Sequence, residues 1–228
     1  MRFEVLTPDS WAEAVSVELM DRLGSSGLRL CLATGATPLP VYARLPGDAL
    51  AKSTVFLLDE FGGLPVGHRG RCETMLRTAL LDRVPAGVFH FPDVDARDLE
   101  VECGRYRDLI NDGGFDLAVL GLGTNGHLGL NEPGSTADQP TRVVKLTEET
   151  REGARRYGAE PPPIWGLAVG LSEILAAREV WLLVTGSAKA AILGRVINDE
   201  KTDQVPATFL KTHPNSVIWA DAEAAHLL

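Results

Sequence analysis

Short apolar runs alternate with helical patterns along the whole of this chain. The runs lack the in-and-out alternation of a half-exposed strand, and most end in a turn of glycine or polar residues. They lie at residues 3–6, 28–33, 55–58, 115–120, 165–169, 180–184 and 217–220. Strands of this kind, separated by helices, predict an α/β fold with an open, mostly parallel, Rossmann-like sheet and helices on both faces.

Length and composition favour one domain. The chain has 228 residues, of which 45% are hydrophobic and 23% charged, so it can bury a full-sized core. Because no repeat or long linker divides the chain, we expect a single domain over residues 1–228. The segment 147–163 combines a strongly charged helical pattern with three successive prolines, and we interpret it as a candidate lid.

The charge of the chain excludes several classes of partner. The net charge is -9 and the isoelectric point about 5.1, whereas nucleic acid and anionic membranes both need a clustered positive field. No window approaches the roughly 18 apolar residues of a membrane span, and the first residues lack a signal-peptide run. Three cysteines without CxxC spacing fit reduced thiols better than a zinc site or disulfides. We therefore expect a soluble cytoplasmic protein without a metal.

Two of the predicted strands end in turns suited to an anion. Residues 34–38 read TGATP and precede a helical pattern, so their glycine, hydroxyls and free backbone N–H groups can approach a phosphate. Residues 185–187 repeat this arrangement, with Lys189 in the first helical turn. Such turns also occur for packing reasons alone. Neither carries a Walker lysine or GxGxxG spacing, which argues against a P-loop or a dinucleotide site.

Two other strands end in acid–base residues. The run 55–58 leads into Asp59 and Glu60, and the run 115–120 leads into a glycine-rich turn with Asn125, His127 and Glu132. Histidine is suited to proton transfer near neutral pH, and a carboxylate nearby can orient its ring. One histidine and one acidic residue are too few ligands for a metal site. Because the carboxyl ends of parallel strands share one edge, we expect these residues to face the two anion turns.

With these residues in view, the chain resembles the glucosamine-6-phosphate deaminase and 6-phosphogluconolactonase superfamily. The matching stretches are LATGATP at 32–38, LLDEFGGLP at 57–65, GLGTNGHLGLNEPG at 121–134 and LLVTGSAKA at 182–190. The sequence NEP at 131–133 resembles the aminosugar-phosphate deaminases more than the lactonases. CLATGATP, CETML at 72–76 and NGHLGLNEPG further resemble the galactosamine-6-phosphate branch, which implies a preference for galactosamine 6-phosphate over glucosamine 6-phosphate.

The resemblance implies a cofactor-free, hydrolytic and isomerising deamination that gives a ketose 6-phosphate and ammonia. His127, supported by Glu132, would open the sugar ring, and Asp59 would move the C2 proton. Asn125 stands where glucosamine-type deaminases usually carry aspartate, which puts a neutral amide beside the histidine. The residues that match the family's phosphate-binding positions are Thr34, Gly35, Ala36, Thr37, Arg156 and Lys189, with Arg155 as an alternative to Arg156.

Two other functions remain open from the sequence. One is a 6-phosphogluconolactonase-like hydrolase, which needs histidine-assisted attack of water but no C2 proton abstraction. The other is a sugar-phosphate sensor that has lost catalysis. For the enzyme we expect a monomer or small homo-oligomer, because Val144 stands where the regulated members of the family place a lysine.

Overall fold

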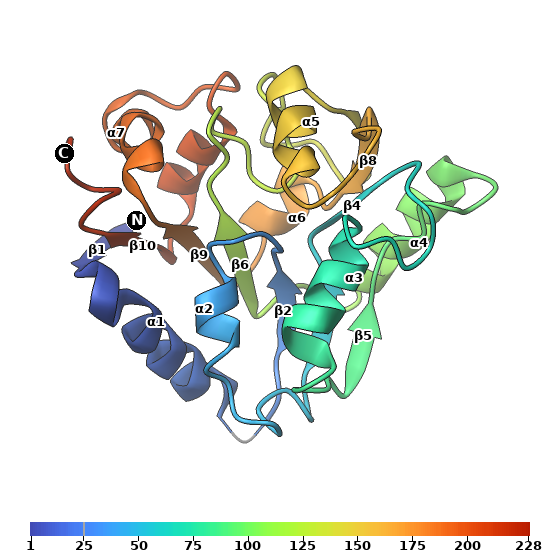
Figure 1. The fold of residues 1–228 in the computed structure, drawn as a ribbon, viewed down its shortest axis with the longest axis horizontal. Coiled ribbons are helices and arrows are strands. Elements are labelled where there is room, and N and C mark those ends of the chain that lie inside the picture. Colours follow the sequence, from blue (N-terminus) through green and yellow to red (C-terminus); the bar gives the residue numbers. More distant parts are fainter. Residues whose placement is uncertain (25) are drawn as a thin grey trace.

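Seven parallel strands form the main sheet of the protein, in the order β1, β10, β9, β6, β2, β3, β5 (Figure 1). The structure is a computed structural model and describes residues 1–24 and 26–228. The strands of this sheet are β1 (Arg2–Leu6), β2 (Arg29–Leu32), β3 (Thr54–Leu57), β5 (Val88–His90), β6 (Leu117–Gly121), β9 (Glu179–Val184) and β10 (Ser216–Asp221). The parallel α/β fold expected from the apolar runs is confirmed.

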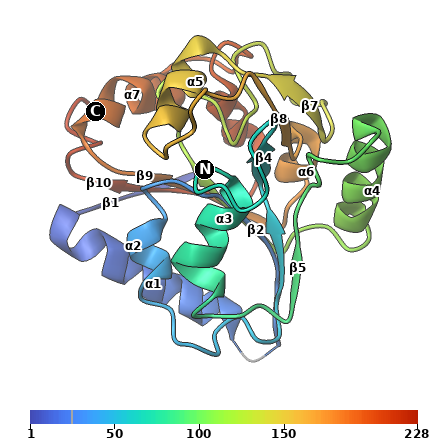
Figure 2. The same ribbon diagram turned by 45° about the vertical axis from the view of Figure 1, so that its right-hand side comes forward.

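Helices cover both faces of this sheet, and Figure 2 shows α1, α2 and α3 together on one side of it. Alternate residues of one strand enter different cores: Leu117 and Val119 pack toward α1 to α3, whereas Ala118 and Leu120 pack toward α4, α6 and α7. The helices are α1 (Pro8–Leu23), α2 (Leu39–Tyr42), α3 (Cys72–Leu76) with the π-helical turn η1 (Arg77–Leu81), α4 (Leu99–Asn111), α5 (Glu148–Arg155), α6 (Leu171–Leu175), η2 (Ser187–Lys189), α7 (Ala190–Asn198) and η3 (Pro206–Thr212).

The longest helix illustrates why the sequence folds in this way. Thr7 caps α1 by accepting a hydrogen bond from the Ser10 backbone N–H, and Pro8 occupies the first helical position, where its missing N–H costs nothing. Trp11, Val15 and Leu19 recur at a spacing of four residues and are buried against the sheet. The cap at Thr7 and the spacing of the apolar residues thus account for where α1 begins and which face it buries.

A second sheet of three antiparallel strands was not expected from the sequence. It has the order β4 (Asp59–Phe61), β8 (Trp165–Ala168), β7 (Arg142–Lys145). The run 165–169, which resembles the other buried strands, therefore belongs to this small sheet and not to the parallel one. Periodicity shows that such a run is buried, but it does not show which strand it pairs with.

The order of strands defines where a ligand can bind. The chain leaves β2 toward β3 on one side, and leaves β6 toward β9 on the other, so β6 and β2 are neighbours whose connections diverge. Open α/β sheets hold their ligands in the crevice outside the carboxyl ends of such a pair. In Figure 1, α5 lies at the top, beyond β6 and β2.

Candidate active site

A cavity of about 490 Å³ opens at this crevice. Its walls come from the turn after β2, from β4, from the loop after β6 and from α5, with Lys189 at the start of α7. The four strand ends singled out in the sequence thus lie together at one edge of the sheet. Among residues 1–24 and 26–228, no group of three or more histidine, cysteine or acidic side chains is placed to hold a metal ion.

Asp59 lines the cavity at the point where β4 begins. The residue is 7% exposed, and Gly129 lies so close that an added Cβ there would stand 2.9 Å from Asp59 Oδ2. Burial raises the pKa of Asp59 to about 6, although a hydrogen bond from Cys72 and the nearby His127 oppose this shift. A carboxylate whose pKa is raised in this way is suited to take a proton near neutral pH.

Glu60 does not join Asp59 in the cavity, because successive side chains of a strand point to opposite sides. Its carboxylate accepts 2.8 Å hydrogen bonds from the backbone N–H groups of Phe61, Cys72 and Glu73. It therefore caps the start of α3, whose Arg71 cap position provides no side-chain hydrogen bond. This cap holds the start of α3 against β4, next to Asp59.

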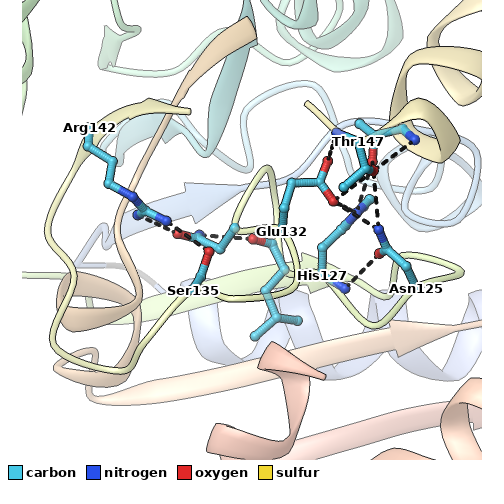
Figure 3. A network of polar contacts seen from close by, with 9 residues as sticks. Asn125, His127, Glu132, Ser135, Arg142 and Thr147 are labelled. Carbon is cyan, nitrogen blue, oxygen red and sulfur yellow. Dashed lines mark hydrogen bonds and ion pairs between the residues drawn. The ribbon is translucent and has the colours of Figure 1, made fainter. Parts of the chain in front are cut away.

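His127, Glu132 and Asn125 form one polar network (Figure 3). Glu132 Oε2 lies 3.3 Å from His127 Nδ1 and accepts a 2.9 Å hydrogen bond from Asn125 Nδ2. Asn125 Oδ1 also accepts a hydrogen bond from the His127 backbone N–H at 3.1 Å. The side-chain amide of Asn125 thus donates to the Glu132 carboxylate and accepts from the His127 backbone, and so links these two residues of the loop.

The charge on Glu132 bears on which nitrogen of the His127 imidazole carries the proton. Burial alone would raise the pKa of Glu132, but hydrogen bonding and the charge of His127 outweigh burial and lower the pKa to about 2. An ionised carboxylate only accepts hydrogen bonds, so it favours the tautomer of His127 with a proton on Nδ1. Nε2 is then free to accept a proton, and this nitrogen lies beside Gly123 on the cavity wall.

A second group of polar contacts anchors the loop that carries the acid. Asn131 is completely buried, and its amide donates 2.9 Å hydrogen bonds to the carbonyls of Leu128 and Val169. Its Oδ1 accepts from Arg142 Nη1 at 2.8 Å, and Arg142 also donates to Ser135 Oγ (Figure 3). Buried polar groups satisfied in this way rigidify a loop. The loop after β6 is therefore held to the small sheet, at β7 and at the end of β8.

The cavity is also lined by positively charged side chains. Burial lowers the pKa of Lys189; the nearby Glu149 opposes this effect, whereas Arg156 reinforces it. Lys189 and Arg156 both line the cavity, next to the turn at residues 34–37, and Gly35 adopts the left-handed φ of 95°. Two cations and free N–H groups on the wall of a cavity provide the donors that a phosphate requires.

The neighbouring Arg155 lies outside the cavity. Its guanidinium forms ion pairs with Glu152 at 3.0 Å and with Glu160 at 2.6 Å. Only Arg156 of the two arginines lines the cavity wall. The geometry of α5 therefore separates two residues that the sequence left as alternatives.

Three further residues of this site were not singled out in the sequence. Thr147 donates to Glu132 Oε2 at 3.2 Å, and Thr150 Oγ1 lies 3.2 Å from His127 Nδ1. Tyr157 lines the cavity, with its hydroxyl 3.3 Å from the position of a Cβ on Gly35. A threonine before an acidic helical pattern signals a helix cap, and only this signal for Thr147 was present in the sequence.

The glycine at 123 gives a direct test of how tightly His127 is held. A Cβ on Gly123 would stand 2.4 Å from His127 Nε2, whereas a Cβ on Gly104, in α4 and outside the cavity, would meet nothing within 4 Å. We expect Gly123→Ala to displace the imidazole and to lower kcat by about tenfold or more, in the range of lost acid–base catalysis. Gly104→Ala should leave kcat within about twofold of the parent, since substitutions away from the site that meet no neighbour are tolerated. Equal effects of the two substitutions on kcat would contradict this arrangement.

Fold and site together define a class of Rossmann-like α/β proteins whose ligand cavity lies at the carboxyl edge of the sheet. Within that class, the chain belongs to the family of glucosamine-6-phosphate isomerases and 6-phosphogluconolactonase, which matches residues 8–219. The family expected from the four sequence stretches is thus confirmed.

Several relatives of the chain are similar over nearly its whole length. The glucosamine-6-phosphate deaminase of Shouchella clausii is 36% identical over 229 residues, which cover 95% of this chain and 93% of that protein. The glucosamine-6-phosphate deaminase of an Exiguobacterium species is 40% identical over 206 residues, or 89% of this chain and 81% of the relative. A placement in the galactosamine branch receives no support from these names.

Solved structures give the same result for the fold. A monomeric glucosamine-6-phosphate deaminase superposes with a TM-score of 0.94 at 28% identity, over 100% of both chains. The 6-phosphogluconolactonase of Thermotoga maritima superposes with a TM-score of 0.76 at 23% identity, over 96% of this chain and 98% of the other. The second likeness shows a shared fold only.

Proposed function

We propose that this protein converts an aminosugar 6-phosphate to a ketose 6-phosphate and ammonia. The observation that carries the proposal is a cavity lined both by a buried carboxyl, Asp59, with His127, and by two cations, Lys189 and Arg156. Two proton-transfer groups and an anion anchor match the two ends of a sugar phosphate. The enzyme activity of the similar deaminases supports the same assignment.

The first step of the proposed reaction opens the sugar ring. His127 Nε2 takes the proton of the anomeric hydroxyl and returns it to the ring oxygen, which gives the free aldehyde. Glu132 stays ionised, keeps the Nδ1 proton in place and stabilises the imidazolium that forms in between. Nε2 is assigned the proton transfer because Nδ1 is already occupied by its contact with Glu132.

The second step moves a proton from C2 to C1. Asp59 takes the C2 proton as general base and returns it to C1. In the same conversion the aldehyde oxygen gains a proton and the amine nitrogen loses one, so that C1 becomes a hydroxymethyl carbon and the C2 amine becomes an imine. Water then adds to C2 and ammonia leaves, so the product is a ketose 6-phosphate. The aldehyde of the substrate stabilises the charge that develops, and the protein supplies the base and the anchored phosphate without a cofactor.

We infer that glucosamine 6-phosphate is the preferred substrate, because the similar curated proteins bear that name. The expectation of galactosamine 6-phosphate rests only on motif details such as Asn125, whose amide is engaged with Glu132 and the backbone of the turn. Neither contact involves the far edge of a sugar, where the C4 epimers differ. Asn125 therefore gives no physical reason for a galactosamine preference.

A coupled ammonia assay tests this function directly. The purified protein should release ammonia from glucosamine 6-phosphate faster than from galactosamine 6-phosphate, and should not hydrolyse 6-phosphogluconolactone at a comparable rate. Unphosphorylated glucosamine serves as the control for the anion anchor. Lactone hydrolysis without ammonia release would overturn the proposal in favour of the hydrolase, and phosphate-ester binding without turnover would favour the sensor.

We also propose that the protein works in the cytoplasm as a monomer or small homo-oligomer. All three cysteines are buried and free, as in proteins from compartments that keep thiols reduced. Within residues 1–24 and 26–228, no helix is both long and apolar enough to cross a membrane. A structural neighbour is described as a monomeric enzyme, which supports a low oligomeric state. Light scattering of the purified protein measures that state.

A further inference from the structure

Helix α5 and its two caps reach two groups of residues in the cavity. Its first turn brings Thr147 and Thr150 to the acid–base network, and its end brings Arg156 and Tyr157 to the anion-binding turn. Arg156, the C-cap residue of α5, lies six positions after Thr150, which corresponds to about 9 Å along a helix. One rigid element therefore reaches from the proton-transfer group to the phosphate anchor.

The imidazole of His127 has two hydrogen-bond partners at similar distances, and neither of them is short. Nδ1 lies 3.3 Å from Glu132 Oε2 and 3.2 Å from Thr150 Oγ1. Strong N–H···O hydrogen bonds are mostly 2.7 to 3.2 Å long, so the carboxylate alone is a weak constraint on the ring. The Thr150 hydroxyl supplies a second contact from another direction.

Thr150 is itself held in place at this position. It is a buried residue, 9% exposed, and its backbone N–H donates to Thr147 Oγ1 at 3.3 Å in the cap of α5. Thr147 Oγ1 also lies 3.2 Å from Thr150 Oγ1 and from Glu132 Oε2. The cap of the helix and the hydrogen-bond network of the histidine thus share the same hydroxyl groups.

We propose that Thr150 is a positioning residue for His127, and that α5 thereby links the anion-binding residues of the cavity to the orientation of the imidazole. The inference deepens the proposed function and rests on it, since it assigns the ring-opening step to His127. When an anion binds at Arg156 and Lys189, it fixes the end of α5, and the helix holds the Thr150 hydroxyl against Nδ1. An anchored phosphate then favours the reactive orientation of Nε2.

Three forms of the protein test this proposal: the parent, Thr150→Val and Thr150→Ser. Valine keeps the β-branched shape and loses the hydroxyl, whereas serine keeps the hydroxyl. We expect Thr150→Val to lower kcat about three- to tenfold, the cost of one hydrogen bond, with little change in KM. Thr150→Ser should stay within about twofold of the parent. Equal losses in both variants, or none in the valine variant, would overturn the positioning role.

A second readout does not depend on turnover. Nitrogen-15 NMR of His127 reports which ring nitrogen carries the proton, and inorganic phosphate serves as the probe for the anion-binding residues. Phosphate should shift the His127 ring signals in the parent and in Thr150→Ser, and shift them clearly less in Thr150→Val at equal phosphate saturation. Identical shifts in all three forms would refute the link through α5. If the parent releases no ammonia, the proposed reaction fails, while these signals still decide the role of Thr150.

Discussion

Asp59→Asn is expected to abolish ammonia release, with kcat lowered by about a thousandfold or more. General-base catalysis contributes typically 10² to 10⁴ in rate, and asparagine has the shape of aspartate but cannot take a proton. The exposed Asp48 provides the matched control, and Asp48→Asn should keep full activity. Any lactone hydrolysis that the parent shows should survive in Asp59→Asn, since that reaction needs no C2 proton abstraction. Retained ammonia release would remove Asp59 from the proposed mechanism.

The same carboxyl determines how activity depends on pH. Because burial raises the pKa of Asp59 to about 6, the free enzyme holds the active carboxylate only above that pH. kcat/KM should rise about tenfold per pH unit below pH 6 and level off above it. A profile that stays flat down to pH 4 would be inconsistent with Asp59 as the base.

Asp59 should also destabilise the folded protein at neutral pH. Its pKa is higher in the folded than in the unfolded chain, so its stabilising effect is present at acid pH and is lost as the pH rises through about 6. A shift from 3.8 to about 6 corresponds to roughly 3 kcal/mol in the free energy of unfolding. Asp59→Asn should therefore raise Tm at pH 8 and change it little at pH 4. Thermal unfolding at both pH values separates this effect from a packing defect, which would lower Tm at each.

The main sheet could be predicted because each of its long strands is a local apolar run that ends in a characteristic turn. β5 (Val88–His90) was missed, since it is a three-residue strand at the edge with an exposed valine. The small sheet of β4, β8 and β7 was missed for a different reason. Local periodicity shows that a run such as 165–169 is buried, but it contains no information about which strand the run pairs with or in which direction.

The residues of the candidate site likewise fall into those that could be predicted from the sequence and those that could not. Asp59, His127 and Glu132 follow predicted strands, and the parallel sheet brings such positions together. Thr150 and Tyr157 lie instead on or beside a charged helix whose sequence shows only a helical pattern. Which face of that helix meets the cavity is set by the fold around it, so their contacts could not be predicted.

Arg156→Ala is the second substitution with a large expected effect, and Arg155→Ala is its natural control. Successive helical residues point about 100° apart, and the two guanidinium groups of this pair accordingly face different surroundings. A hydrogen bond between charged groups contributes about 1.5 to 3 kcal/mol, so Arg156→Ala should raise KM for the sugar phosphate about 10- to 100-fold. The inhibition constant for inorganic phosphate should rise by a similar factor.

Arg155→Ala should change KM less than about twofold, because exposed ion pairs such as those with Glu152 and Glu160 contribute little. Arg156→Lys should recover part of the affinity, since it restores the charge without the planar pair of donors. Activity on an unphosphorylated aminosugar, if measurable, should be equal in the parent and both alanine variants, because only the phosphate would meet Arg156. The opposite ranking, with KM raised by Arg155→Ala alone, would show that α5 turns in the complex and presents Arg155 to the phosphate.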